Sequence, residues 1–179
     1  RRNAAWALCP HAPQRPVAES WIRLARPPEA IRIGAIVRAA EVIDGLFLRQ
    51  VSPDNESLLL RLSADTSPLG RARLDYFVLN KGPWSSLDHE HPFLPGIGEK
   101  PDAANFYPAD ADRQQMQSWF DGLPAAQRES ATGFFTTIRR DAAGKLVVVP
   151  YSLEYQGELQ RAAHWLRAAA GHTSHRTLK

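Results

Sequence analysis

Two histidines one residue apart, His89 and His91, are the residues whose type and spacing could bind a metal ion. Side chains at alternate positions of an extended segment point the same way, so both imidazoles could reach one zinc ion. A zinc site needs a third protein ligand, and no obvious one lies nearby in the sequence. We therefore interpret the pair as exposed loop histidines, keep His89 and His91 as the metal candidates, and expect no cofactor in this chain.

None of the catalytic motifs that we searched for is complete in this sequence. After His89-Glu90, Pro92 forbids the helical turn that the zinc-peptidase motif H-E-x-x-H requires. Gly96 and Gly98 resemble the start of a dinucleotide fingerprint, but no strand is predicted before them. The sequence contains no G-x-S-x-G segment of the kind that presents a nucleophilic serine. We therefore assign no catalytic residue.

The histidines belong to a stretch, residues 87–108, that is rich in proline, glycine and aromatic residues. Each buried ring contributes roughly 2 kcal/mol, which can order a segment that has no backbone ladder. We interpret the stretch as a long ordered loop attached to a hydrophobic surface. Asn105 within it could satisfy backbone groups or contact a ligand. The candidate loop contacts are Asn105, Tyr107 and, later in the chain, Tyr151.

The charge of the chain lies unevenly along the sequence. The net charge is +3, whereas residues 1–27 alone hold five arginines against one glutamate, a net of +4, so the rest carries −1. A nucleic-acid binder is expected to show a basic stripe on a folded element, and none is visible. No run is long enough to span a membrane, and one cysteine permits no internal disulfide. We expect a cytoplasmic protein, or a periplasmic one if an export signal has been removed.

The elements that must position these residues are mainly helical. Four apolar residues recur at steps of four, three and four and predict a helix from Glu29 to about Val51: Ile36, Ala40, Ile43 and Phe47. Ser52-Pro53 and Ser67-Pro68 each pair a capping hydroxyl with a proline at the first helical position. The helix after Ser67 should bury Leu74, Phe77 and Val78 and end near residues 80–82.

The second half of the chain adds a β-hairpin between helices. Asp112 can cap a helix, with Gln115 at the reciprocal position and Met116, Trp119 and Phe120 on the apolar face. A short helix is predicted over Ala125–Ser130. Phe134–Arg139 and Lys145–Val149 are rich in β-branched and aromatic residues and flank a turn, which indicates a hairpin. From Ser152 to Gly171 five apolar residues share one helical face: Tyr155, Leu159, Ala162, Leu166 and Ala169.

These elements predict an α+β fold, mostly helical, with one β-hairpin and a long ordered loop of proline, glycine and aromatic residues. At 179 residues the chain is long enough for one domain with a core. We expect a poorly ordered lead-in over residues 1–28, a single α+β domain over 29–171 and a tail over 172–179 without regular structure.

Three segments resemble the front portion of bacterial members of the dipeptidyl peptidase III family. They are LNKGPWSSLD (79–88), KPDAANFYPAD (100–110) and VVVPYSLEYQ (147–156), in that order. The resemblance covers about residues 30–170; Ser85-Ser86 and Asp102-Ala103 depart from the commoner choices. It implies a two-lobed zinc metallopeptidase that releases dipeptides, with zinc as the cofactor of the parent family. The family's zinc motif and its peptide-anchoring segment are not among these residues.

The resemblance implies that this chain is an N-terminal, non-catalytic portion of such a zinc hydrolase and is inactive alone. Its partner would be the missing C-terminal part of the parent enzyme, or a second copy through the exposed face, and the parent would act on peptides. The alternative is a stand-alone protein-interaction module that uses the loop or the hairpin edge. We expect neither nucleic acid nor membrane as a partner.

Overall fold

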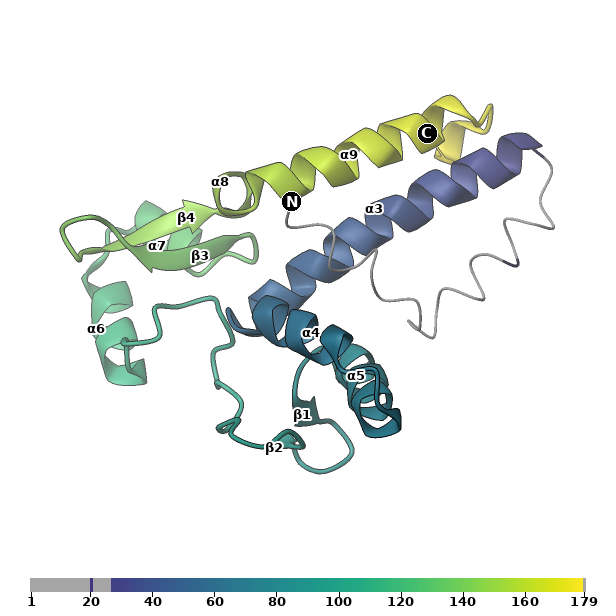
Figure 1. Ribbon diagram of the computed structural model, residues 1–179. Coiled ribbons are helices and arrows are strands. Elements are labelled where there is room, and N and C mark those ends of the chain that lie inside the picture. Colours follow the sequence, from purple (N-terminus) through teal and green to yellow (C-terminus); the bar gives the residue numbers. More distant parts are fainter. Residues whose placement is uncertain (1–19, 21–26, 179) are drawn as a thin grey trace. The chain divides into compact units, whose positions relative to one another are not determined.

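The protein is described by a computed structural model that covers residue 20 and residues 27–178 (Figure 1). The predicted lead-in over residues 1–28 lies almost wholly outside these described residues. Contacts divide the chain into two compact units, of which unit 2 is Pro101–Gln156 and unit 1 comprises Arg1–Lys100 and Gly157–Lys179. The single domain expected over 29–171 stays a prediction.

The described residues form helices and two small antiparallel sheets, which confirms the predicted α+β class and its helical majority. One hairpin, in the 84–92 region, was not predicted. Unit 1 contains α3 (Pro27–Val51), α4 (Asn55–Ala64), α5 (Pro68–Asn80), β1 (Trp84–Ser85), β2 (His91–Pro92), nearly all of α9 (Gln156–Gly171) and the 3-10 helix η1 (Arg176–Leu178). Unit 2 contains α6 (Arg113–Gly122), α7 (Ala125–Ala131), β3 (Thr136–Arg140), β4 (Leu146–Pro150) and α8 (Tyr151–Glu154).

Helix α5 forms where the sequence predicts it. The Ser67 hydroxyl accepts a hydrogen bond from the backbone N–H of Gly70, and Pro68 occupies the first turn, where its missing N–H is harmless. The helix ends at Asn80. Lys81 caps it with a left-handed φ of 58°, and the Gly82 N–H donates to the Phe77 carbonyl. The helix therefore ends where predicted, but Lys81 and not Gly82 adopts the left-handed conformation.

The predicted start of the preceding helix at Ser52-Pro53 is wrong by two residues. The Ser52 N–H still donates to the Leu48 carbonyl and so completes α3, while the Ser52 hydroxyl accepts from the Asp54 N–H at 3.4 Å in the connecting turn. Helix α4 begins at Asn55, after Asp54, whose side chain makes no capping bond. A serine before a proline can end one helix as well as begin the next, and the sequence does not distinguish the two.

Six leucines, one phenylalanine and one valine form the core of unit 1. The buried cluster joins the end of α3 to α4, α5 and the loop: Leu48, Leu58, Leu59, Leu62, Leu74, Phe77, Val78 and Leu94. Phe93 and Ile97 pack against it, and the Trp84 indole N–H donates to the Gly98 carbonyl at 3.0 Å. The first part of the proline-rich loop is thus fixed to a hydrophobic surface, as predicted.

Helix α3 turns a different face inward from the one that its bulkiest residues suggest. The helix has two neighbouring apolar stripes with the same spacing. Its buried stripe contains Ala35, Ala39 and Leu46, whereas Ile36, Ile43 and Phe47 remain about half exposed. The two stripes differ by one residue, or about 100° around the helix, so periodicity alone could not decide between them.

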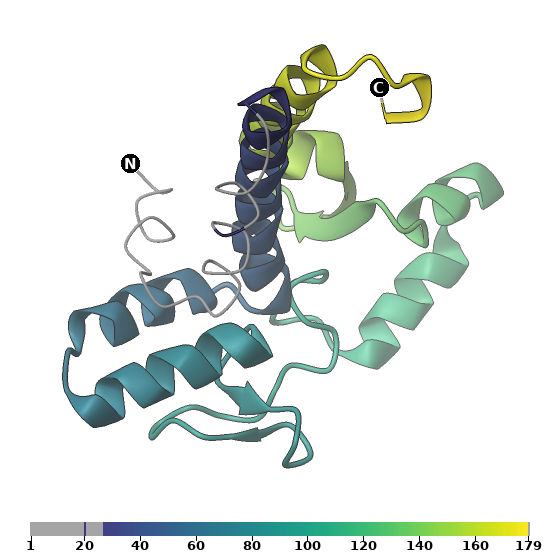
Figure 2. The ribbon, with the colours of Figure 1, turned by 90° about the vertical axis from the view of Figure 1, so that its right-hand side faces the viewer.

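Helices α3 and α9 run antiparallel beside each other in unit 1 (Figures 1 and 2). Arg38 lies 4.5 Å from the centre of the Trp165 ring, a cation–π contact. Arg32 donates to the Thr173 hydroxyl at 3.3 Å, and Thr173 is buried. Residues 172–178, predicted as a tail without regular structure, therefore contain a buried residue and end in η1.

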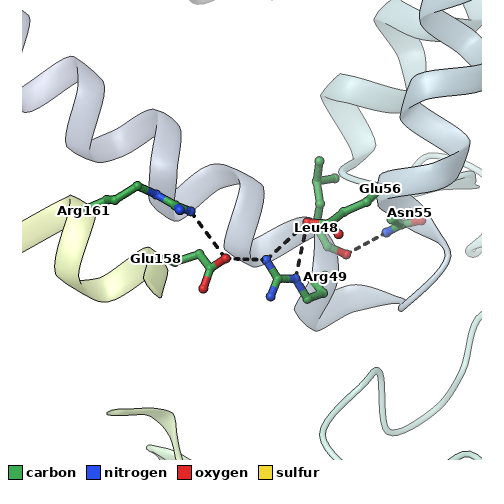
Figure 3. A network of polar contacts seen from close by, with 6 residues as sticks. All are labelled: Leu48, Arg49, Asn55, Glu56, Glu158 and Arg161. Atoms are coloured by element: carbon green, nitrogen blue, oxygen red, sulfur yellow. Dashed lines mark hydrogen bonds and ion pairs between the residues drawn. The ribbon is translucent and has the colours of Figure 1, made fainter. Parts of the chain in front are cut away.

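An arginine joins the ends of α3, α4 and α9 (Figure 3). Arg49 contacts the Glu158 carboxylate at 2.8 Å and that of Glu56 at 3.3 Å, and Arg161 reaches Glu158 at 3.4 Å. Burial raises the pKa of Glu158, but hydrogen bonds and the Arg49 charge outweigh it and hold the pKa below its ordinary value. The ion pair therefore stays formed at neutral pH.

Unit 2 is built around the predicted hairpin. Strands β3 and β4 pair antiparallel with Ile138 opposite Val148, slightly later in the chain than expected, which leaves Phe134 outside the strand and exposed. Asp112 caps α6 by accepting from the Gln115 N–H, as predicted. The Gln115 side chain does not complete the reciprocal cap, because its oxygen accepts from Arg140 at 3.3 Å.

The core of unit 2 is small. Only Met116, Ala131 and Ile138 are buried in its cluster, with other apolar residues packed around them.

The predicted helix over Ser152–Gly171 is divided into α8 and α9, which meet at Tyr155. Of its predicted apolar face Tyr155, Ala162 and Ala169 are buried, whereas Leu166 is exposed.

Candidate functional site

The two candidate metal ligands lie in a tight turn rather than in an extended segment. His89 and Glu90 both have positive φ, 49° and 61°, and the His91 N–H donates to the Asp88 carbonyl at 2.9 Å. This geometry is a type I′ turn between β1 and β2. Both histidines are exposed. We expected both imidazoles to point the same way because the backbone would be extended. The backbone is not extended here, so it gives no reason to expect that the two histidines bind one ion.

Two polar side chains of this turn, those of Glu90 and His91, make polar contacts close by. The His91 ring nitrogen Nδ1 lies 2.8 Å from the Asp88 carbonyl, and Lys100 pairs with Glu90 at 2.6 Å. Within residue 20 and residues 27–178, no three side chains of His, Cys, Asp or Glu lie close enough together to hold a metal ion. The described residues therefore do not fit a zinc site, and we derive no zinc-dependent step from them.

The segments that hold two of the three candidate loop contacts are joined by one arginine of unit 2. Arg139 on β3 donates to the Asn105 carbonyl at 3.0 Å and pairs with Glu154 of α8 at 2.7 Å. Tyr151, at the start of α8, lies three residues before Glu154, and the Arg139 charge lowers the pKa of its phenol, an effect that burial outweighs. The segments around residues 105 and 151, which carried the family resemblance, thus converge on β3.

Backbone hydrogen bonds complete this convergence. The Ile138 N–H donates to the Phe106 carbonyl, and the Tyr151 N–H donates to the Phe135 carbonyl, each at 2.8 Å. Ile138 lies in β3 and Phe135 directly precedes that strand, and each of them bonds a segment that is far away in the sequence. Strand β3 is therefore the element that holds the two motif segments of unit 2 in place.

The third candidate, Tyr107, lies apart from this arginine. Its ring packs edge-on against Phe120 of α6, with centroids 6.3 Å apart, and belongs to the apolar surroundings of the unit 2 core. Nearby, residues in or next to α6, α7 and β4 line a partly open pocket of about 310 Å³. It is lined by Trp119, Leu123, Gln127, Ser130, Leu146, Val147 and Val148. None of these side chains titrates near neutral pH, so the pocket can hold an apolar group but offers no acid or base.

The chemistry open to the Arg139 cluster is equally limited. Burial raises the pKa of the Tyr151 phenol above 10.0, and the opposing effect of the Arg139 charge is smaller. Tyr151 is therefore a neutral phenol at pH 7, which can donate a hydrogen bond but cannot act as a base. The Arg139 guanidinium is engaged by Glu154 and two backbone carbonyls, those of Asn105 and Ile138. The cluster can fix backbone segments and bind through a hydroxyl.

The first motif segment, 79–88, has a structural role in unit 1. The buried Asn55 side chain donates to the Leu48 and Lys81 carbonyls and so ties the ends of α3 and α5 together. A Cβ atom at Gly82 would lie 3.0 Å from the Trp84 ring and 3.4 Å from the Asn55 side chain, so any larger residue there would require these side chains to shift. The Tyr76 and Ser85 hydroxyls lie 2.6 Å apart and join α5 to β1.

Sequence reasoning missed the arginines that organise both units. Arg49 bonds Glu158 across 109 positions of sequence, and Arg139 bonds the Asn105 carbonyl across 34. A charged residue at the buried end of an apolar helix is one available signal for Arg49, and two adjacent arginines in a strand are one for Arg139. Neither signal names a partner, because pairing at such separations depends on the tertiary fold.

Comparison with solved structures shows which proteins this chain is similar to. No model of a protein family matches the sequence. The solved structure of dipeptidyl-peptidase III from Corallococcus sp. strain EGB matches 85% of this chain at 52% identity and a TM-score of 0.82. This chain corresponds to part of a dipeptidyl-peptidase-III-like protein. The structure of DPP III from Caldithrix abyssi matches 87% of it at 37% identity and a TM-score of 0.79. The family resemblance predicted from the three motifs is confirmed.

The DPP-III-like portion spans only part of each relative. It covers 28% and 29% of the two solved chains. A relative from Arabidopsis thaliana named Nudix hydrolase 3 is 32% identical over 196 residues and is covered to 25% of its length. That name denotes another hydrolase class, and three quarters of the plant protein lie outside the match. The name therefore does not assign its activity to the matching quarter.

No helix in the described part of the chain is both long and apolar enough to cross a membrane.

Proposed function

We propose that this chain is the non-catalytic N-terminal portion of a dipeptidyl-peptidase-III-like zinc hydrolase and is inactive alone. The observation that carries the proposal is the 52% identity and TM-score of 0.82 to a dipeptidyl-peptidase III, of which the chain spans 28%. Identity at this level over 85% of the chain supports a common architecture, and the partial span is consistent with a larger enzyme.

The proposed role of this portion is to shape the framework of the larger enzyme. Its three motif segments are held by contacts within the two units: the Asn55 side chain donates to the Lys81 carbonyl in unit 1, and Arg139 bonds the Asn105 carbonyl and Glu154 in unit 2. None of these contacts pairs a nucleophile with a base, as covalent catalysis would require. The zinc ion and the groups that bind peptide would belong to the rest of the enzyme.

The partners follow from the same proposal. The rest of the peptidase would pack against this portion, and the complete enzyme would act on peptides. In its absence, a second copy could cover the same surface. We keep the cytoplasm as the expected compartment, with the periplasm as the alternative.

A hydrolysis assay tests the proposal. The purified chain is mixed with a dipeptidyl-naphthylamide substrate and zinc, beside the complete Corallococcus sp. enzyme as the positive control. We expect release of naphthylamine by the complete enzyme and none by this chain. Turnover by this chain that a chelator abolishes would contradict the proposal.

A further inference from the structure

The exposed apolar residues of α3 form a continuous surface. Ile36, Ile43 and Phe47, with the exposed Ala40 between them, follow the steps of four, three and four that place residues on one helical face. The three large side chains are 47%, 45% and 47% exposed. We call these four residues the outer stripe. It lies beside the buried stripe of Ala35, Ala39 and Leu46, so apolar residues cover two adjoining faces of α3.

A helix that is apolar on two adjoining faces is typical of the interior of a larger structure, since a surface helix usually shows one apolar face. Two polar residues of α3 contact other parts of unit 1 instead of the outer stripe. Arg38 stacks on Trp165, and Asp44 pairs with Lys81 at 2.8 Å. The hydrophobic clusters of the described residues include none of the outer-stripe residues.

We propose that the outer stripe is the surface on which the part of the peptidase outside this chain packs, through an uncharged apolar helix or strand face. This inference rests on the proposed function. The choice of occupant rests on the relatives, in which chain beyond the matching 28% or 29% is present to cover such a face.

A second copy of this chain is the less suitable occupant. A stable protein–protein interface buries about 800 Å² on each partner. Three half-exposed side chains along a single helix supply far less apolar area than that. A small apolar surface of this kind suits a contact inside one continuous chain, where association costs no translational freedom.

The experiment compares the same substitutions in two settings. In the first, Ile43→Glu and Phe47→Glu are introduced into this chain alone. In the second, they are introduced into a chimera, the complete Corallococcus sp. enzyme whose matching stretch is replaced by residues 28–178 of this chain. Ile43→Leu and Phe47→Leu are the matched controls, because they keep the stripe apolar. Melting temperature and dipeptidyl-naphthylamide hydrolysis are measured in the chimera, and melting temperature in this chain.

We expect each glutamate to shift the melting temperature of this chain by less than about 2 °C, because the substituted positions are about half exposed and the carboxylate can remain in water. In the chimera each should lower it by about 5 °C or more and reduce hydrolysis, because a buried unpaired charge is strongly destabilising. The leucine controls should match the parent chimera. If the glutamates leave the chimera unchanged, the inference is wrong while the proposed function stands.

The remaining outcomes are also decisive. A large loss of melting temperature in this chain alone would mean that the chain itself covers the stripe, which contradicts the inference. Self-association of this chain that Phe47→Glu abolishes, with an unaffected chimera, would assign the stripe to a second copy and would also contradict it. An unsubstituted chimera that is inactive would contradict the proposed function instead.

Discussion

The two units of the chain are stabilised in different ways. Unit 1 buries eight hydrophobic residues in one cluster, dominated by leucines of α4 and α5, whereas the cluster of unit 2 buries three. Unit 2 relies instead on arginines that bond backbone carbonyls and acids: Arg128 to Phe120 and Asp121, Arg139 to Asn105 and Glu154, and Arg140 to Asp110 and Gly144.

This difference has a physical consequence for each unit. Buried apolar area stabilises a fold in proportion to its size and changes little with salt. Hydrogen bonds from a guanidinium fix chosen segments in a defined geometry, and each adds only a modest net free energy. Unit 1 therefore has the larger margin of stability, and unit 2 has the more specifically held loops. The predictions below test this contrast.

The largest effect is expected from the core of unit 1. Phe77 is fully buried, so Phe77→Ala should lower the free energy of unfolding by about 3–5 kcal/mol. Urea denaturation followed by circular dichroism measures it. Leu79→Ala is the matched control on the same helix, and it should cost no more than about 0.5 kcal/mol because Leu79 is exposed. Equal costs for the two variants would contradict the assigned core.

An intermediate effect is expected in unit 2. Arg139→Met removes the bonds to Asn105 and Glu154 and leaves a half-buried carboxylate without its charge partner, a loss of about 2–3 kcal/mol. Arg139→Lys should lose about half as much, because it keeps the charge but not the planar fork. Hydrogen exchange should accelerate chiefly in residues 101–156. Unchanged exchange there would refute the bridging role of Arg139.

The smallest effect is expected at the Arg49–Glu158 pair and depends on pH. The pKa of Glu158 is lowered in the folded protein, so the pair stabilises fully above the ordinary value of 4.5 and loses its effect as the pH falls below it. Glu158→Gln should cost about 1–2 kcal/mol at pH 7 and progressively less as the medium becomes more acidic. Melting temperatures across this range measure the difference, with the exposed Glu129→Gln as control. A cost that is independent of pH would contradict the ion pair.

The sequence predicted best where local chemistry decides the structure. The Ser67 cap, the Asp112 cap and the turn at 141–144 depend on neighbouring residues alone, and all three form. It failed where local chemistry allows two outcomes. Ser52 ends one helix instead of starting another, and α3 buries the stripe of smaller residues instead of the larger. Only the packing of α3 in the folded unit decides between such alternatives.

The candidate site was less predictable than the fold. Aromatic residues indicated that the loop would be held in place, and Trp84 and Phe93 hold it. The two adjacent arginines in the strand were a signal for Arg139, but the sequence did not indicate that Arg139 would join the segments around Asn105 and Tyr151. The family resemblance found those segments because their residues are distinctive, while the contact between them is a property of the tertiary structure.

The central claim is that the zinc chemistry of the larger enzyme lies outside this chain, and metal analysis tests it most directly. The purified chain is dialysed against buffer with excess zinc and then against metal-free buffer, and bound zinc is measured by mass spectrometry. The account predicts no stoichiometric zinc, with His89→Ala and His91→Ala identical to the parent chain. One zinc ion retained per chain and lost in either variant would contradict it.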